Sequence, residues 1–181
     1  DITDSKKNEE DLKYHAYFDQ LTKLPNRMLF SDRAETALNQ AKRSKDGLAI
    51  IFIDLDELKT INDTLGHEAG DTMLKTISQR FIKSARNTDT VSRRGGDEFT
   101  ILLPRIKNTE DAAILAERIL ESNKEGIQIS NKSVYPKTSI GISVFPDDGD
   151  TVDILIKNAD KAMYHAKESG KNQYCFYKDN F

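Results

Sequence analysis

The chain has 181 residues, which is enough for one domain with a complete hydrophobic core. Duplex-binding proteins are usually basic, so the net charge of -3 argues against a nucleic-acid partner. Cys175 is the only cysteine, so no internal disulfide can form and a reducing, cytoplasmic compartment fits. No signal peptide is visible, and the longest clean apolar run, Leu48 to Ile53, is too short to span a bilayer.

The first segment, residues 4–17, is polar and compatible with a helix, and its apolar positions are sparse. It therefore predicts a linker helix that packs weakly. Pro25 interrupts it, and a helix over about 26–44 follows. We accordingly divide the chain into an N-terminal linker helix, 1–17, and a domain, 18–181. The start at Asp1 rather than Met suggests a fragment of a longer protein.

The domain then alternates strands and helices. A buried strand over 47–54 precedes two helices, the second of which repeats apolar residues at helical spacing. A hairpin over a Gly95-Gly96 turn comes next. The expected ranges are 56–65 and 68–85 for the two helices, 90–94 and 98–103 for the hairpin, 110–123 for a helix, 127–130 and 134–145 for strands, 151–168 for a helix and 173–177 for a closing strand.

This order predicts an α+β fold with a split β-α-β plan, an antiparallel sheet, and helices on one face. In such a plan the third strand lies between the first two and runs antiparallel to the first. The end of the first strand, at Asp54, should then lie opposite Asp97 and Glu98. Residues more than forty positions apart would thereby meet at one site.

Adjacent acids after a tight turn repel one another, and a divalent cation between them is the most plausible reason to keep them. Asp54, Asp97 and Glu98 would supply the oxygen ligands that Mg²⁺ or Mn²⁺ needs. Other interpretations stay open for each part: Asp54 can cap a helix, and a Gly-Gly pair can be an ordinary hairpin turn. Strict alternation would also send Asp97 and Glu98 to opposite faces, so the sequence does not decide whether both are direct ligands.

Five motifs in chain order resemble the GGDEF family of diguanylate cyclases, and the resemblance covers nearly the whole chain. Gly95 to Phe99 spells the motif that gives the family its name. The other matching segments are Asp19 to Arg27 (D-x-L-T-x-L-P-N-R), Asp54 to His67 with Gly70-Asp71, Ala159 to Lys167 (A-D-x-A-M-Y-x-A-K) and Gly170-Lys171-Asn172.

The resemblance implies a palm-like, ferredoxin-like nucleotidyl cyclase fold, with a central, mostly antiparallel five-stranded sheet flanked by helices. It also implies a reaction that joins two GTP into cyclic di-GMP and releases two pyrophosphates. Each 3'-OH attacks the α-phosphate of the other GTP, so two domains must face each other as a homodimer. Metal ions would stabilise the charge on the attacking and leaving oxygens.

The resemblance also assigns residues. Asp54, Asp97 and the Leu55 carbonyl look like metal ligands, and Glu98 resembles either the acid that deprotonates the 3'-OH or a ligand of a second metal. Asn62 and Asp71 look like guanine readers. The phosphate contacts would be Lys59, Lys167 and Lys171, although lysines at a helix C-terminus are also ordinary solvated residues. Gly95 and Gly96 would let the backbone approach the nucleotide closely.

Two positions depart from the family pattern. Leu58 stands where phenylalanine is frequent, which changes only packing. Lys171 stands where arginine is common, so a bidentate phosphate contact would be lost and GTP affinity would fall. Neither change removes a chemical group that the reaction requires.

Arg86-Asn87-Thr88-Asp89 matches the family's R-x-x-D inhibitory site, with the expected five residues between Asp89 and Gly95. There Arg86 would bind product phosphate or stack on guanine, and Asp89 would accept from the guanine edge. The resemblance therefore implies feedback inhibition by cyclic di-GMP. The plainer interpretation is an arginine at a helix end followed by a loop aspartate.

The edges of the chain suggest neighbouring domains. Asp1-Ile2-Thr3 resembles the linker after a PAS sensor, and the stretch to Tyr177 resembles versions that continue into an EAL phosphodiesterase domain. The full-length protein would then be soluble or membrane-attached. One competing function is a silent module that binds GTP or cyclic di-GMP and regulates an attached domain, which the retained acids disfavour. Another is a cyclase of mixed purine specificity, which Asp71 disfavours.

Overall fold

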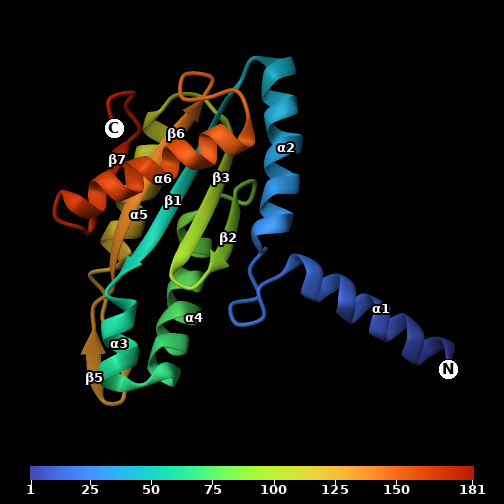
Figure 1. The fold of residues 1–181 in the computed structure, drawn as a ribbon, viewed down its shortest axis with the longest axis vertical. Coiled ribbons are helices and arrows are strands. Elements are labelled where there is room, and N and C mark those ends of the chain that lie inside the picture. Colours follow the sequence, from blue (N-terminus) through green and yellow to red (C-terminus); the bar gives the residue numbers. More distant parts are fainter.

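The computed structural model describes residues 1–181 and is built around a five-stranded sheet (Figure 1). The strands lie in the order β2-β3-β1-β6-β7, and only the β6–β7 pair is parallel. The mostly antiparallel α+β fold is therefore confirmed. The elements are α1 Ile2–Tyr17, α2 Arg27–Ser44, β1 Gly47–Asp56, α3 Leu58–Leu65, α4 His67–Ser84, β2 Thr90–Gly95, β3 Glu98–Ile106, α5 Glu110–Ser122, β4 Ile127–Ile129, β5 Lys132–Val134, β6 Lys137–Phe145, α6 Val152–Glu168 and β7 Gln173–Phe176.

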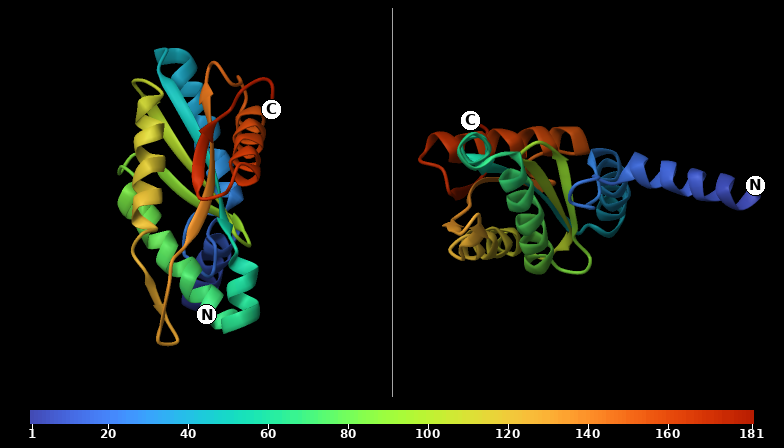
Figure 2. Two further views of the ribbon diagram at one scale, coloured as in Figure 1. Left: turned by 90° about the vertical axis from the view of Figure 1, so that its left-hand side faces the viewer. Right: turned by 90° about the horizontal axis from the view of Figure 1, so that it is seen from below.

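Helices cover both faces of this sheet, so the expectation of helices on one face was wrong. Figure 2 shows α4 and α5 on one side and α6 on the other. The central strand β1 explains this arrangement: Ile51 and Ile53 join the core cluster under α4 and α5, whereas Ile50 and Phe52 join the cluster under α2 and α6. A continuous apolar run, rather than an alternating one, is typical of a strand buried on both faces.

The pairing of β1 with β3 follows the predicted plan. β3 lies between β2 and β1 and runs antiparallel to β1, which brings Asp54 directly opposite Glu98. β1 also continues through Asp56, so Asp54 and Asp56 lie on the same face by strand alternation. Glu57 then takes a left-handed backbone, with φ of 67°, and α3 begins only at Leu58.

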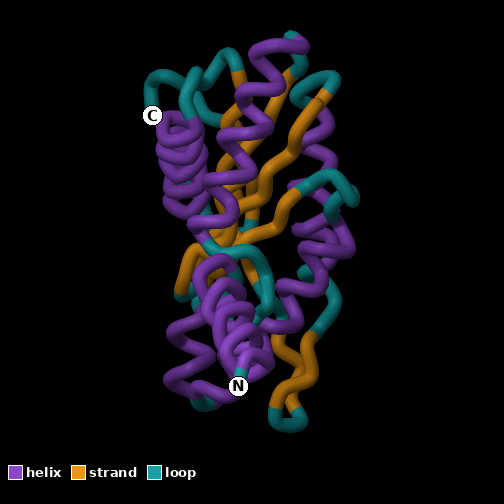
Figure 3. The backbone as a smooth tube through the Cα atoms, turned by 90° about the vertical axis from the view of Figure 1, so that its right-hand side faces the viewer, coloured by secondary structure: helices purple, strands orange, loops and turns teal.

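The predicted strand over 134–145 divides into two elements. β5 pairs with β4 in a separate two-stranded ribbon, and β6 alone enters the main sheet (Figure 3). Ser130 and Asn131 both have positive φ, at 49° and 63°, which fits the tight hairpin turn of the ribbon. Pro136, which has no N–H to donate, lies between β5 and β6.

Helix α1 projects from the body of the molecule and buries no residue (Figure 1). Its end is held by Asn26, whose Nδ2 donates to the Ala16 carbonyl at 2.8 Å and whose backbone N–H donates to the Tyr17 carbonyl at 2.8 Å. The same side chain caps α2 by accepting from the N–H groups of Met28 and Leu29. No helix of the protein has the length and apolar character needed to cross a membrane.

Helix α6 lies directly against β6. At Gly141 a β-carbon would collide with the Ala159 carbonyl and the Met163 amide of α6, so only glycine permits this approach. The contact fixes the helix that carries Asp160 and Lys167 over the end of β1.

Candidate active site

Asp54 is the central acid of the site and lies near the end of β1. Its side chain is 10% exposed, and Oδ1 accepts a hydrogen bond from Nζ of Lys167 at 2.9 Å. Burial raises the pKa of Asp54 to about 6; the nearby charge of Asp97 adds to the rise, whereas the Lys167 bond opposes it. Asp54 is thus a carboxylate with little solvent and one cationic partner.

The glycine turn holds Asp97 next to this acid. Gly95 and Gly96 both have positive φ, at 144° and 53°, which the turn requires and glycine tolerates. The backbone carbonyl of Asp97 accepts from the Leu55 N–H at 3.0 Å. This bond fixes the acidic turn against the end of β1.

Glu98 begins β3, and its charge neighbours include Asp160 of α6 and Arg94 of β2. Burial raises the pKa of Glu98, and the charges of Asp160 and Asp97 add to the rise. The Arg94 guanidinium lies 5.6 Å from the ring centroid of Phe52. Glu98 therefore belongs to a second charge group beside the Asp54–Lys167 pair.

The predicted convergence of three acids on one cation is not seen in this conformation. No three His, Cys, Asp or Glu side chains are grouped to hold a metal ion. The charge of Asp97 raises the pKa of Asp54, and Lys167 places a positive group 2.9 Å from Asp54.

Asn62 of α3 packs against α4 at the position before Asp71. The side-chain amide of Asn62 occupies the space where a β-carbon would stand at Gly70, the residue before Asp71. Lys59 lies one turn earlier in α3 and is exposed. The structure thus places Asn62 against the residue that precedes Asp71 in α4.

Lys171 lies in the short loop between α6 and β7. Its φ is 61°, and its backbone N–H donates to the Ala166 carbonyl at 3.1 Å. The side chain is exposed. Lys167 and Lys171 therefore stand on either side of the C-terminal end of α6.

Arg86 and Asp89 form an ion pair with each other. Arg86 Nη2 lies 2.9 Å from Asp89 Oδ1, and the Arg86 N–H donates to Asp89 Oδ2 at 2.8 Å. Arg86 Nη2 also donates to the Pro104 carbonyl at 3.1 Å. Both residues line a cavity of about 160 Å³ together with Arg118, which sequence reasoning did not single out.

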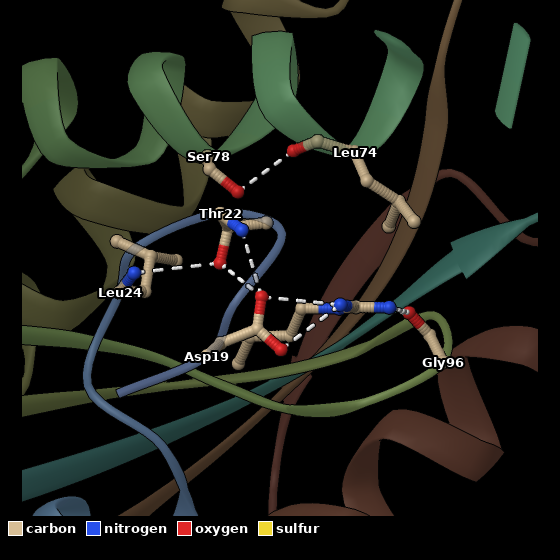
Figure 4. A network of polar contacts seen from close by, with 7 residues as sticks. Asp19, Thr22, Leu24, Leu74, Ser78 and Gly96 are labelled. Carbon is tan, nitrogen blue, oxygen red and sulfur yellow. Dashed lines mark hydrogen bonds and ion pairs between the residues drawn. The ribbon is translucent and has the colours of Figure 1, made fainter. Parts of the chain in front are cut away.

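A second group that sequence reasoning missed joins the start of the domain to the glycine turn (Figure 4). Arg93 Nη1 lies 3.0 Å from Asp19 Oδ1, while Nη2 donates to the Gly96 carbonyl at 2.8 Å. Asp19 also accepts from the backbone and side chain of Thr22, at 2.8 and 2.7 Å. The D-x-L-T spacing was visible, but its partner lies 74 residues away and only the fold reveals it.

Comparison with known proteins agrees with this arrangement. The family model described as diguanylate cyclase, GGDEF domain, matches residues 16–173. The chain is 46% identical over 165 residues to the bifunctional diguanylate cyclase/cyclic di-GMP phosphodiesterase MucR of Pseudomonas aeruginosa, covering 91% of this chain and 24% of MucR.

Solved structures show the same fold. A shortened TpbB from Pseudomonas aeruginosa, comprising only the GGDEF domain, superposes with a TM-score of 0.89 at 40% identity, covering 91% of this chain and 96% of that one. The GGDEF domain of DgcB from Caulobacter crescentus, solved in complex with c-di-GMP, gives 0.81 at 27% identity, covering 89% and 95%. These matches agree with the fold and with the β1–β3 register, which places Asp54 opposite Glu98. The chain therefore belongs to the GGDEF domain family of diguanylate cyclases.

Proposed function

We propose that this domain is an active diguanylate cyclase that condenses two GTP into cyclic di-GMP and two pyrophosphates. The observation that carries the proposal is the register of β1 and β3, which places Asp54 opposite Glu98 while the Leu55 N–H holds the Asp97 carbonyl. All the acids of the family's reaction centre are retained at one sheet end. A module that had lost catalysis would have no need to keep mutually repelling carboxylates there.

Asp54, Asp97 and the Leu55 carbonyl would hold Mg²⁺ or Mn²⁺. When bound, the ion would neutralise charge on the phosphates and on the attacking and leaving oxygens. The high pKa of Asp54 fits this role, because a buried carboxylate with an unfavourable charge gains most from a cation. Lys167, whose Nζ donates to Asp54 in this structure, would then contact the phosphates instead.

The remaining residues bind and orient the nucleotide. Asn62 and Asp71 would read the guanine edge, and loss of one such bond lowers discrimination by about 1–3 kcal/mol. Lys59, Lys167 and Lys171 would hold the triphosphate, and the Gly95-Gly96 backbone would approach it closely. Glu98, whose pKa is raised, would accept the proton of the 3'-OH.

Catalysis on this plan needs a second copy of the domain. One copy holds one GTP, and each 3'-OH must reach the α-phosphate of the other nucleotide. The reaction therefore requires a homodimer in which the two β1–β3 ends face each other. Turnover should rise more than linearly with protein concentration.

Product feedback is proposed for Arg86 and Asp89. The two side chains pair with each other at 2.9 Å, and Arg118 and Asp111 also line the cavity that they share. Cyclic di-GMP presents two phosphates and two guanines, which suit arginine donors and an aspartate acceptor. Binding there would require the Arg86–Asp89 pair to open.

The experiment is incubation of the domain at high concentration with GTP and Mg²⁺ or Mn²⁺, with cyclic di-GMP read by mass. Asp97→Asn and Glu98→Gln variants serve as matched controls that keep side-chain size. Product that rises more than linearly with protein and disappears in both variants supports the cyclase. Absence of product after forced dimerisation, with GTP still bound, excludes it.

A silent regulatory module is the second candidate, favoured by the names of some relatives. The chain is 37% identical over 166 residues to the cyclic di-GMP phosphodiesterase NbdA of Pseudomonas aeruginosa, covering 92% of this chain and 21% of NbdA. In that role the domain would bind GTP or cyclic di-GMP and control an attached domain. Response of such a domain to GTP in an Asp97→Asn variant would distinguish the two functions.

The chain spans about a quarter of the length of MucR. We propose that the folded domain corresponds to residues 18–181 and that 1–17 form a linker helix, because α1 buries no side chain. A sensor domain ahead of α1 and an EAL phosphodiesterase domain after β7 would then supply signal input and a second activity.

A further inference from the structure

Asp56, the second acid of β1, is buried as deeply as Asp54 but has different partners. It is 4% exposed, against 7% for Asp54. Neither the proposed metal ligands nor the proposed nucleotide contacts include it. The role inferred here for Asp56 rests on the proposed function, because it concerns a lysine that we assign to phosphate binding.

The carboxylate of Asp56 accepts hydrogen bonds from β6 and from the loop after α6. The Ser139 hydroxyl of β6 donates to Oδ1 at 2.9 Å and also lies 3.1 Å from Oδ2. The backbone N–H of Asn172 donates to Oδ2 at 3.1 Å. Buried polar atoms need hydrogen-bond partners, so Asp56 ties β1 to β6 and to the loop after α6.

The loop that it holds has an unusual backbone. Gly170, Lys171 and Asn172 follow one another with φ of 123°, 61° and 46°. Two successive non-glycine residues in the left-handed region are unfavourable, and surrounding contacts must maintain them. The Lys171 N–H donates to the Ala166 carbonyl at 3.1 Å, the Asn172 side chain accepts from the Thr138 N–H at 3.3 Å, and Asp56 accepts from the Asn172 N–H.

The two acids therefore hold the end of α6 at two points from one face of β1. Asp54 holds Lys167, a side chain that can leave for a ligand. Asp56 accepts from the backbone N–H of Asn172, next to Lys171. This backbone contact would persist when a ligand binds, because the N–H is not a proposed ligand contact. We propose that Asp56 is a positioning residue that fixes the Lys171 loop, so that Lys171 faces the triphosphate when Lys167 leaves Asp54.

The first test measures amide hydrogen exchange without nucleotide, so it stands even if the domain makes no cyclic di-GMP. In the wild-type domain the Asn172 N–H should be protected although it lies in a loop. In Asp56→Ala it should exchange about tenfold faster, while the Tyr177 N–H, bonded to the Ile142 carbonyl at 2.7 Å, changes little. An unprotected Asn172 in the wild type, or equal acceleration at both amides, overturns the proposal.

The second test measures GTP affinity by calorimetry with Mg²⁺, alongside kcat and KM. Asp56→Ala should raise Kd and KM by about tenfold and lower kcat by less, because it misplaces a binding group. In a Lys171→Ala background the same change should add little, since the lysine is already absent. An equal effect in both backgrounds overturns the proposal.

Two further variants separate positioning from general loss of structure. Asp56→Asn keeps an oxygen for the Asn172 N–H and an amide for Ser139, so it should restore Asn172 protection and most of the GTP affinity. Asp150→Ala removes an exposed carboxylate ahead of α6 and should change neither. If the Asn172 N–H is protected in Asp56→Asn but this variant binds GTP as weakly as Asp56→Ala, the contact between Asp56 and the Asn172 N–H does not position Lys171. That result overturns the proposal.

Discussion

Lys167 Nζ lies 2.9 Å from Asp54 Oδ1, so the acid at the centre of the candidate site is paired with a cation from a helix that lies 113 residues later in the chain. The pair offsets only part of the burial penalty, because the pKa of Asp54 is still about 6. A metal-free domain thus holds an unfavourable charge at the place where a divalent ion is proposed to bind.

Replacement of Asp54 should stabilise the metal-free domain at neutral pH. Because the folded-state pKa is about 6 and the ordinary value 3.8, ionisation of Asp54 disfavours folding as pH rises between these values. We expect Asp54→Asn to raise the free energy of unfolding by about 1–2 kcal/mol at pH 8 with a chelator present, and the gain to vanish below pH about 4. Urea denaturation across pH measures this, and a gain that does not vary with pH would contradict it.

Asp19→Asn should have the opposite pH dependence. Burial alone would raise the pKa of Asp19, but hydrogen bonds from Thr22 and the charge of Arg93 hold it below its ordinary value. Its stabilising contribution is therefore present at neutral pH and is lost as pH falls below about 4.

We expect Asp19→Asn to lower the free energy of unfolding by about 1–3 kcal/mol at pH 7, and by progressively less as pH falls below about 4. Urea denaturation of this variant beside Asp32→Asn, which changes an exposed aspartate of α2, measures the difference. Identical losses in the two variants would show that the Asp19–Arg93 pair does not stabilise the domain.

Gly70→Ala should reduce GTP affinity, although alanine is normally the better helix former by about 1 kcal/mol. The new methyl group would take the space of the Asn62 amide and displace this proposed guanine reader. We expect KM for GTP to rise about tenfold with little change in kcat. Thr72→Ala, on the exposed side of the same helix, is the control; equal KM values in wild type and Gly70→Ala would exclude Asn62 as a guanine contact.

Arg86→Ala should remove product inhibition without changing the reaction itself. Arg86 contacts Asp89 and the Pro104 carbonyl and lies outside the Asp54 site. We expect the cyclic di-GMP concentration for half inhibition to rise at least about tenfold, since charge-assisted bonds contribute about 1.5–3 kcal/mol each. Arg105→Ala changes an exposed arginine of β3 and should behave as wild type. Unchanged product sensitivity in Arg86→Ala would mean that the inhibitory site lies elsewhere.

Most elements could be predicted from local signals, and the β1–β3 pairing from the split plan that their order implies. The apolar run before Asp54 and the glycine turn before Asp97 identify a strand and a hairpin, and the split plan then determines which ends meet. The prediction that helices cover only one face was wrong. The run from Leu48 to Ile53 is apolar throughout, so it shows no alternation from which a solvent-exposed face could be identified.

Side-chain partners were the least predictable part. Lys167 was expected at phosphate, and its bond to Asp54 follows from the close approach of α6 to Gly141. Asp56 was left without an assigned partner, since its donors come from β6 and from a loop more than a hundred residues later. Such contacts depend on the packing of elements, which no periodicity in the sequence records.

The Asp19–Arg93 pair also means that the glycine turn is joined to the chain that enters the domain. Asn26 holds the last turn of α1 at the Ala16 carbonyl, the neighbouring Pro25 carbonyl accepts from the Arg93 N–H at 3.1 Å, and Arg93 holds Gly96. A short series of contacts thus connects the end of α1 to the acidic turn. The end of α1 and the turn that carries Asp97 are thus coupled through Arg93, an edge-strand residue of β2, so a displacement of α1 would act on this turn.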